Sequence, residues 1–172
     1  IAIGAFLGYL QASGNFHEVI PGELYRSAQL SSDEIGRYQK EFGIRSIINL
    51  RGENDGEAWY DQEIAEAKDL GVTHIDFRMS SGRMLARDDA TRLIALMRSA
   101  PKPLLIHCQA GADRSGLAAS LYLAAIAGMS EEDAEAQLSL RFGHVGIPWL
   151  SQTYAMDETW EAFETWLGFD GS

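Results

Sequence analysis

Short apolar runs alternate with amphipathic stretches along most of the chain. Residues 44–50, 72–77 and 104–107 have the length and composition of buried strands, and helical periodicity fills the segments between them. This alternation predicts a three-layer α/β fold, in which a mostly parallel central sheet of four or five strands is flanked by helices. No repeat or linker divides the sequence, so residues 16–172 are expected to form a single domain.

Residues that are typical of helix ends locate the predicted helices. Ser31 and Glu34 form a capping box ahead of a helix that Gly43 closes. An aspartate, either Asp88 or Asp89, is expected to cap a later helix whose apolar positions fall on one face. Further helices are expected at residues 57–70, 115–127, 130 onward and 151–167, the last with aromatic side chains that pack in the core.

The composition is that of a globular domain, with 46% hydrophobic and 23% charged residues. Twenty-five acidic residues against 14 basic ones give a net charge of −11, which argues against nucleic acid as a partner because phosphate binding needs clustered cations. Residues 78–98 depart from this balance, with five arginines against two aspartates. Arg83 and Arg87 in this segment could attract an anionic substrate, although solvated surface charges are the simpler interpretation.

Cysteine use narrows the chemistry further. Cys108 is the single cysteine, which excludes an internal disulfide, a Cys-rich zinc site and a redox pair of the Cys-x-x-Cys type. It leaves open a reactive thiol.

The chemistry concentrates in residues 104–117, where a buried strand runs through a short loop into a helix. The loop contains Gly111, and such a turn directs successive backbone N–H groups into one concavity at the positive end of the helix dipole. A tetrahedral oxyanion such as phosphate fits this concavity. Arg114 can add a bidentate guanidinium fork to two phosphate oxygens.

Cys108 opens the same loop, so its sulfur is expected beneath the bound phosphorus. The loop amides, the helix dipole and Arg114 all favour the thiolate, which is the nucleophilic form of a cysteine. Ser115 could donate its hydroxyl to the sulfur when the sulfur leaves. His107 is expected to orient the loop through a ring N–H rather than to bind a metal, because no second ligand has a suitable local spacing.

The stretch HCQAGADRSG at residues 107–116 resembles the active-site motif of the Cys-x5-Arg protein tyrosine phosphatase superfamily. Two further stretches, LYRSAQ at 24–29 and IINLRGE at 47–53, are similar to bacterial dual-specificity and tyrosine phosphatases. The resemblance extends over most of residues 16–145.

This resemblance implies hydrolysis of a phosphomonoester in two displacements through a phosphocysteine, without a cofactor or a metal. The expected partner is a phosphorylated protein, with phosphotyrosine favoured, and the chain is expected to act as a monomer. Two alternatives stay open, a phosphoinositide phosphatase with the same chemistry and a phosphate-binding module without turnover. The residues expected to bind the phosphate with Arg114 are Gln109, Ala110, Gly111 and Ala112.

Several aspartates are candidates for the acid that protonates the leaving group. Relatives of the dual-specificity type carry an aspartate on the loop before the preceding helix, whereas residues 79–87 here contain no Asp or Glu. Asp113 inside the phosphate loop is the favoured acid, by similarity to bacterial tyrosine and lipid phosphatases. Its alternative role is an N-cap of the following helix. The other candidate acids are Asp76, Asp88 and Asp89.

Several other polar residues are candidates for the site. Arg51 follows a buried strand, so we expect it to line the site or to pair with Asp113, with a surface salt bridge as the alternative. Arg26 and Ser27 are expected to pack within an N-terminal strand. The remaining candidates, expected in a turn after a helix rather than at the pocket rim, are Arg141 and His144.

The first ten residues are mostly apolar, and ten residues are too few to cross a bilayer. Two interpretations of segment 1–15 stay open, a helix folded onto the domain and the remnant of a membrane anchor. In the second case the domain of a bacterial protein would be tethered on the periplasmic side of the membrane. We expect this location rather than the cytoplasm.

Overall fold

Five strands form one sheet in the computed structural model, which describes residues 2–169. The strand order is β1-β2-β5-β3-β4, and every neighbouring pair is parallel except β1 with β2. The predicted α/β fold with a mostly parallel sheet is therefore confirmed. The strands are β1 (His17–Ile20), β2 (Leu24–Ser27), β3 (Ser46–Asn49), β4 (Thr73–Asp76) and β5 (Leu104–His107).

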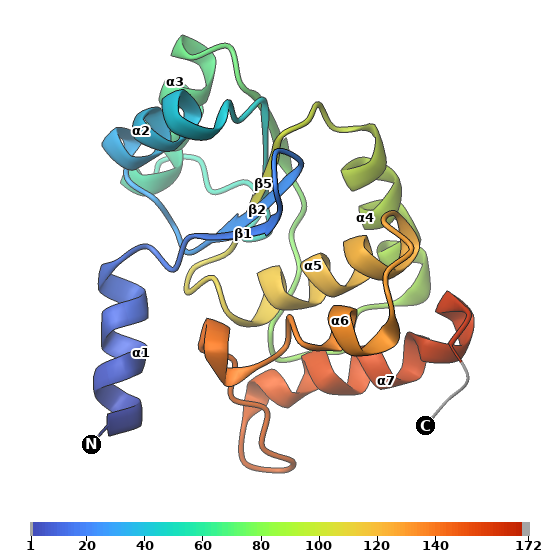
Figure 1. Ribbon diagram of the computed structural model, residues 1–172. Coiled ribbons are helices and arrows are strands. Elements are labelled where there is room, and N and C mark those ends of the chain that lie inside the picture. Colours follow the sequence, from blue (N-terminus) through green and yellow to red (C-terminus); the bar gives the residue numbers. More distant parts are fainter. Residues whose placement is uncertain (1, 170–172) are drawn as a thin grey trace.

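Helices cover both faces of this sheet. The helical elements are α1 (Ala2–Ala12), α2 (Ser32–Phe42), α3 (Ala58–Asp69), α4 (Arg87–Ser99), α5 (Asp113–Ala125), α6 (Glu131–Glu135), η1 (Leu140–Phe142), η2 (Gln152–Tyr154) and α7 (Ala155–Leu167). Figure 1 shows α2 and α3 on one side of the strands and α4, α5, α6 and α7 on the other. The helix that follows the phosphate loop, α5, packs against α4, α6 and α7 and is buried over most of its length.

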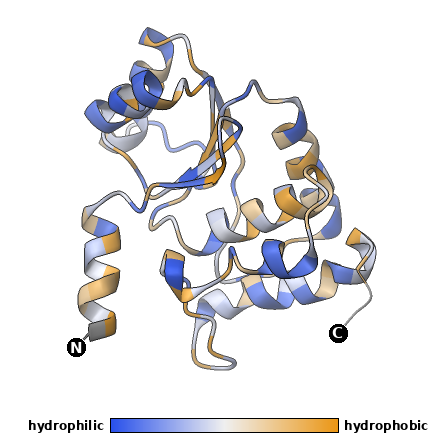
Figure 2. Cartoon of the chain, viewed as in Figure 1, coloured by the Kyte–Doolittle hydropathy of each residue, from blue (hydrophilic) through white to orange (hydrophobic). Residues whose placement is uncertain are grey.

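Successive residues of the central strands point into two separate cores. Ile48 and Ile106 belong to the larger core beneath α4, α5 and α7, whereas Ile47 and Leu105 belong to the smaller core beneath α2 and α3. In Figure 2 the apolar colour follows the strands and α5, while α2 and α3 carry much of the polar colour. Burial on both faces explains why these strands appear in the sequence as continuous apolar runs.

The ends of several elements differ from the prediction. The N-cap of α4 is Ala86, whose side chain makes no capping hydrogen bond, so the caps predicted at Asp88 and Asp89 are wrong. Both aspartates lie in the first turn of α4, where the helix dipole still favours a negative charge. Helix α5 begins and ends two residues earlier than the predicted 115–127. The short helix η2 replaces the first turn of the predicted last helix, and Trp160 and Phe163 of α7 pack in the core as expected.

The first helix, α1, lies at the edge of the molecule (Figure 1). Its Leu10 is buried close to Gly143, whereas Ile3 and Tyr9 are exposed. No helix within residues 2–169 combines the length and the apolar character of a membrane span. The anchor interpretation of segment 1–15 stays a prediction.

Candidate active site

Three parallel strands end together at the edge of the sheet that carries the site. Ser27 of β2 and Asn49 of β3 both pair with His107, the last residue of β5. The loop of residues 108–112 continues from β5 and leads directly into α5. Ligands of parallel sheets gather at such carboxyl ends, next to the N-terminus of the following helix.

The thiol of Cys108 lies at the centre of the loop and is 2% exposed. The backbone N–H of Gly111 donates to its sulfur at an N–S distance of 3.2 Å. The Ser115 hydroxyl oxygen lies 3.5 Å from the same sulfur. The structure therefore brings together the predicted nucleophile, the loop amide and the serine, with two donors within reach of an anionic sulfur.

Arg26 holds the second half of the loop from behind. One terminal nitrogen of its guanidinium, Nη2, donates to the carbonyls of Gly111 and Ala112 at 3.0 and 2.8 Å. The other, Nη1, donates to the carbonyl and the side-chain oxygen of Gln137 at 2.8 and 3.0 Å. The side chain is fully buried and lies over the ring of Phe142. Arg26 packs within a strand, as expected from the sequence, and it also fixes the loop, which the sequence did not show.

Asn15 and Gln29 hold the first half of the loop. The side-chain amide nitrogen of Asn15 donates to the carbonyl of Ala110 at 3.0 Å, and the backbone N–H of Gln29 donates to the carbonyl of Gln109 at 3.1 Å. Asn15 is buried and adopts a positive φ of 43°, a conformation that asparagine tolerates better than most residues. Sequence reasoning missed both supports, because each lies about 80 or more residues away from the loop along the chain.

Four successive carbonyls, from residue 109 to residue 112, thus accept hydrogen bonds from groups outside the loop. In a planar trans peptide the N–H points opposite to the C=O, so the N–H groups of residues 110–113 face the other way. The bond from Gly111 to the sulfur of Cys108 shows that this other side is the interior of the loop. The result is a preorganised concavity of N–H donors, suited to a tetrahedral oxyanion.

Gly111 is required by conformation and by space. Its φ is +72°, and a Cβ at this position would lie 2.5 Å from the backbone N of Ala28 and 2.6 Å from the carbonyl carbon of Ser27. The loop can pass this close to the end of β2 only without a side chain.

Arg114 follows the loop and is partly buried. Its Nη1 donates to the carbonyl of Met79 at 3.4 Å, which places the guanidinium beside the segment between β4 and α4. Burial is the main cause of the lowered pKa of Arg51, and the positive charge of Arg114 lowers this pKa further. The two guanidinium groups therefore lie near each other.

Arg51 lies at the margin of the site. Its guanidinium stacks 3.5 Å from the ring centre of Trp59, and its Nη1 donates to the side-chain oxygen of Gln29 at 3.0 Å. The predicted pair between Arg51 and Asp113 is wrong, because these contacts hold Arg51 and Asp113 instead accepts a bond from His144.

A buried carboxylate lies under the strand that leads into the loop. Glu63 of α3 is 1% exposed and accepts from His107 Nε2 at 2.9 Å, from His74 Nε2 at 2.7 Å and from the side-chain amide of Gln29 at 2.6 Å. Burial alone would raise the pKa of Glu63, but His107 and the three hydrogen bonds hold it well below its usual range.

From the sequence, His107 is expected to orient the loop through a ring N–H. In the structure the partner of that N–H is Glu63. Glu63 was missed, although a signal exists in the sequence. It lies three residues after Tyr60 and four before Ala67, and these three form the buried face of α3. A charged residue in the middle of such a face must have a partner inside the protein.

Asp113 is the first residue of α5, and the N-cap is Ala112, so the alternative role of Asp113 as an N-cap is not observed. Its Oδ1 accepts from Nδ1 of His144 at 2.7 Å. His144 lies in a turn after η1, as expected, but its side chain is buried rather than part of a surface turn. Arg141, expected in the same turn, lies within η1 instead, is exposed and has its guanidinium over the ring of Phe142.

The sequence was then compared with known proteins. A sequence model described as "Tyrosine phosphatase family" matches residues 7–137. The chain belongs to the tyrosine phosphatase family. A search of curated protein sequences gives no match.

Solved structures show the same fold as this tyrosine phosphatase family member. TpbA from P. aeruginosa superposes with a TM-score of 0.68 at 20% identity, over 88% of this chain and 86% of that chain. The core catalytic domain of the PP-IP phosphatase SIW14 from S. cerevisiae gives 0.64 at 21% identity, over 88% and 91%. PTPMT1 gives 0.62 at 17% identity, over 87% and 96%. At these identities the likeness establishes a shared fold.

The other acidic candidates occupy different surroundings in this phosphatase fold. Asp76 ends β4 and accepts from the hydroxyl of Tyr60 at 2.6 Å and from the side-chain amide of Asn49 at 2.8 Å. Asp89 is half exposed and pairs with Arg92 on its own helix at 3.1 Å. Among the described residues, no group of three or more His, Cys, Asp or Glu side chains is arranged to hold a metal ion.

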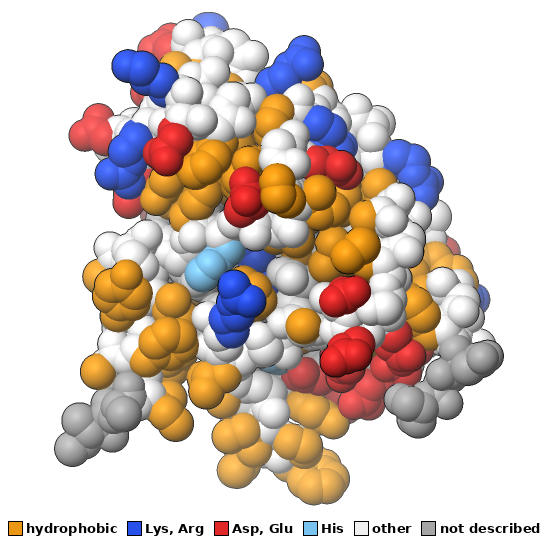
Figure 3. Space-filling view, viewed as in Figure 1, with side chains coloured by type: hydrophobic (Ala, Val, Ile, Leu, Met, Phe, Trp, Pro, Cys, Tyr) orange, Lys and Arg blue, Asp and Glu red, His pale blue; other side chains and the backbone are white. Residues whose placement is uncertain are grey.

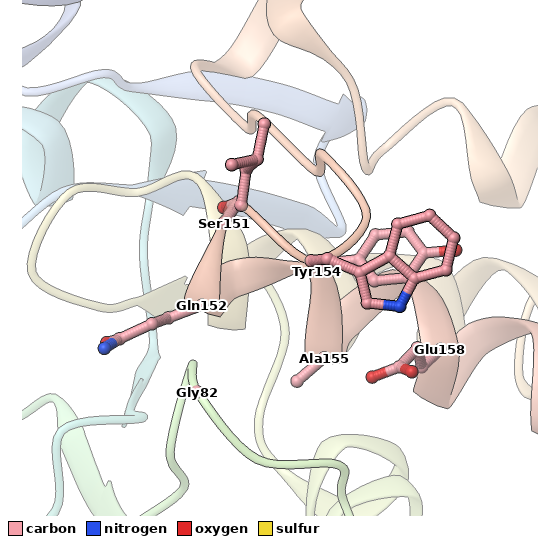
Figure 4. Close-up of a pocket in the computed structure, with 8 residues that line it drawn as sticks. Gly82, Ser151, Gln152, Tyr154, Ala155 and Glu158 are labelled. Carbon is pink, nitrogen blue, oxygen red and sulfur yellow. The ribbon is translucent and has the colours of Figure 1, made fainter.

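Two cavities flank the segment between β4 and α4. One, of about 320 Å³, is lined among others by Met79, Arg83 and Asp89, so it adjoins the carbonyl to which Arg114 donates. The second, of about 310 Å³, lies between Gly82 and the segment around Gln152 (Figure 4). Arg83 therefore lines a hollow next to the site, whereas Arg87 stacks on Trp166.

The acidic excess is concentrated on part of the surface. Figure 3 shows acidic side chains gathered over α6 and α7, whose first turns carry Glu131, Glu132, Asp133, Asp157 and Glu158. Arg51, Arg78 and Arg83 lie in the segments that follow β3 and β4, and Arg114 lies in the first turn of α5. Four arginines of an acidic chain thus lie in the segments around the phosphate loop.

Proposed function

We propose that this protein hydrolyses phosphomonoesters through a phosphocysteine intermediate and that phosphotyrosine in proteins is its substrate. The observation that carries the proposal is the position of the Cys108 sulfur, which accepts from the Gly111 N–H in a loop whose carbonyls are held from outside. Membership of the tyrosine phosphatase family supports the same chemistry.

The reaction proceeds in two displacements. In the first, the Cys108 sulfur attacks phosphorus, the S–P bond forms, the bond to the leaving oxygen breaks, and Asp113 gives that oxygen a proton. In the second, water loses a proton to Asp113 and attacks phosphorus, and the sulfur leaves as a thiolate with Ser115 as hydrogen-bond donor. The N–H groups of residues 110–113 and the guanidinium of Arg114 hold the remaining phosphate oxygens throughout.

Phosphotyrosine is favoured for two reasons. A variant of TpbA, whose fold is similar over 92% of this chain with a TM-score of 0.67, has been solved in complex with pTyr. The cavity lined by Met79 and Arg83 adjoins the carbonyl to which Arg114 donates, so it can receive a residue next to a phosphotyrosine.

Turnover of p-nitrophenyl phosphate tests the enzymatic part of the proposal. We expect the wild-type protein to release p-nitrophenol, the Cys108→Ser variant to lose at least about 10³-fold in kcat, and the Arg114→Lys variant to lose much of its activity. A phosphate-binding module would instead retain phosphopeptides without releasing phosphate, and Cys108→Ser would leave its affinity unchanged.

A substrate panel then separates the substrate classes. PTPMT1, which shares the fold, has been solved in complex with PI(5)P, so phosphoinositides form the second arm. The loop residues Gln109, Ala110 and Ala112 add no cation for a polyanionic headgroup, so we expect higher kcat/KM for phosphotyrosine peptides. Higher kcat/KM for phosphoinositides than for every phosphopeptide would contradict the substrate assignment and leave the chemistry intact.

A further inference from the structure

A buried histidine lies between two carboxylates directly behind the proposed acid. Nδ1 of His144 lies 2.7 Å from Oδ1 of Asp113, and Nε2 lies 2.9 Å from Oδ2 of Asp157. The histidine side chain is 2% exposed, whereas the two aspartates keep 20% and 23% of their side chains exposed. Both ring nitrogens are therefore used, and the exposed part of Asp113 remains free to meet a ligand.

Three separate parts of the chain form this cluster. Asp113 is the first residue of α5, Asp157 lies in the first turn of α7, and His144 lies in the connection between η1 and η2. The backbone N–H of His144 donates to the carbonyl of Ser139, which fixes the connection. Gly146 leaves room for the Asp157 carboxylate, because a Cβ added at that position would overlap Oδ2 of the aspartate.

The arrangement requires a particular charge state. A neutral imidazole has one N–H and can donate to only one of the two carboxylates, whereas an imidazolium donates to both. Burial alone would lower the pKa of His144, but the hydrogen bonds and charges of Asp113 and Asp157 raise it to about 9. The groups that face the cluster are Asp113 from α5, Asp157 from α7 and Arg26 from β2, which interacts with the charge of Asp113.

We propose that His144 is a positioning residue that holds Asp113 and stores the proton that Asp113 gives to the leaving group, with Asp157 keeping the ring in place. The proposal rests on the proposed function, in which Asp113 is the acid. In the first displacement Asp113 takes the Nδ1 proton of His144 and passes it to the leaving oxygen. The ring is then neutral and keeps its Nε2 proton toward Asp157.

The second displacement reverses this transfer. The attacking water loses its proton to Asp113, which returns a proton to Nδ1 of His144, while the O–P bond forms and the electron pair of the S–P bond returns to sulfur. One proton thus moves out and back in each turnover, and no further reactant is needed. A relay of this kind lets a carboxylate act as an acid at a pH where it is itself ionised.

The pH range is the main consequence. An isolated aspartic acid, with a pKa of about 3.9, retains its proton in only about one molecule in a thousand at pH 7. A proton shared with His144 is retained until the pH passes about 9. The histidine pKa is raised above its unfolded value of about 6.5, so the contribution of the cluster to stability is complete below that pH and is lost as the pH approaches 9.

The test compares kcat/KM, which reports the first displacement and not the hydrolysis of the phosphocysteine, between pH 5 and pH 10 for two substrates. Phenyl phosphate has a poor leaving group that needs the proton, and p-nitrophenyl phosphate has a good one that needs it far less. For the wild-type protein we expect kcat/KM with phenyl phosphate to hold up to about pH 9. For His144→Gln, which retains an amide donor but has no transferable proton, we expect a loss of at least tenfold at pH 7 and a much smaller effect on p-nitrophenyl phosphate.

Two variants keep the histidine and disturb its partner. Asp157→Asn removes one of the two charges that raise the pKa of His144, and Gly146→Ala displaces the Asp157 carboxylate, so both should shift the alkaline limb of the kcat/KM profile to lower pH by a unit or more. Glu161→Gln, an exposed position one turn further along α7, is the control and should leave the limb in place. If His144→Gln does not fold, these two variants carry the test. Equal losses at every pH and for both substrates would overturn the proposal and leave His144 a structural role.

Nuclear magnetic resonance of the imidazole separates this proposal from the proposed function. We expect the ring of His144 to titrate near pH 9 in the wild-type protein and at lower pH in Asp113→Asn, whether or not the protein turns over a substrate. A titration near 6.5 in the wild-type protein would overturn the relay even in an active phosphatase. A titration near 9 in a protein without any phosphatase activity would leave the cluster standing and overturn the proposed function.

Discussion

At the scale of single residues, the loop depends on Gly111 in two ways that can be separated. Gly111 and Gly128 both adopt positive φ, +72° and +64°, but of the two only Gly111 leaves no room for a side chain, since an added Cβ would lie within 3 Å of the backbone of Ser27 and Ala28. We expect Gly128→Ala to cost about 1 kcal/mol of stability from conformation alone, and Gly111→Ala about 3 kcal/mol because β2 or the loop must also shift. Urea unfolding measures both. Equal costs would show that the close approach contributes nothing.

Asp113 is tested against Asp89, one of the alternative acids. We expect Asp113→Asn to lower kcat/KM for phenyl phosphate by about 10²-fold or more and to affect kcat/KM for p-nitrophenyl phosphate much less, since kcat/KM reports the first displacement, in which general acid catalysis matters most for a poor leaving group. Asp89→Asn should leave both rates close to wild type, because Asp89 is half exposed and pairs with Arg92. The reverse pattern between the two variants would assign the acid to α4.

Glu63 contributes to stability in a way that depends on pH. Its pKa is lowered in the folded protein because His107, His74 and Gln29 outweigh the cost of burial, so its contribution is complete above the unfolded pKa of about 4.3 and is lost as the pH falls below that value. We expect Glu63→Gln to lose about 2–4 kcal/mol at pH 7 and the difference from wild type to narrow between pH 5 and pH 2. Urea unfolding across this range is the measurement. Asp69→Asn, an exposed change on the same helix, serves as the control, and a difference that does not vary with pH would contradict the assignment.

At the scale of elements, local patterns were sufficient for the nucleophilic half of the site. The strand 104–107, the turn at Gly111 and the start of α5 follow one another along the chain, so apolar runs, a glycine and a helix signal locate them without tertiary information. The start of α4 was less predictable, because Asp88 and Asp89 are good caps and yet the N-cap is Ala86, two or three residues earlier. Residue preferences at the N-cap indicate that a helix begins nearby, but they do not fix the residue at which it begins.

Arg26 of β2 connects the phosphate loop to the segment after α6, and a substitution at this position tests that connection. Lysine retains the charge of arginine but cannot donate simultaneously to Gln137 and to the two loop carbonyls, so we expect Arg26→Lys to lose about 2–4 kcal/mol of stability. Because the carbonyls are then free to turn inward, vanadate should inhibit the variant at least tenfold less strongly. Arg141→Lys, which changes an exposed arginine over the same Phe142 ring, is the matched control. Unchanged vanadate inhibition in Arg26→Lys would show that the loop holds its shape without this clamp.

At the scale of the whole molecule, the parts of the site that sequence reasoning missed are those made by long-range contacts. Arg26 reaches Gln137 across 111 residues, Asn15 reaches Ala110 across 95, and Glu63 reaches His107 across 44. In the sequence Arg26 and Asn15 resemble ordinary strand or surface residues, and the apolar face around Glu63 shows that it needs a buried partner without showing which one. Only the strand order brings these residues beneath one loop. His144 shows the same limitation, because nothing within its own turn indicates that α5 and α7 present a carboxylate to each ring nitrogen.

The distribution of charge over the whole molecule should decide which phosphopeptides reach the site at low salt. A chain of 172 residues has a radius of gyration of about 16 Å, smaller than the screening length of about 30 Å at 10 mM salt but larger than that of about 8 Å at 0.15 M. At 10 mM an approaching peptide therefore responds to the net charge of −11, whereas at 0.15 M it responds mainly to the arginines beside the loop. We expect phosphotyrosine peptides with basic flanks to show higher kcat/KM than those with acidic flanks at 10 mM, with the ratio falling as salt rises. A preference for acidic flanks at 10 mM, or a ratio that does not change with salt, would show that the local arginines dominate at all distances.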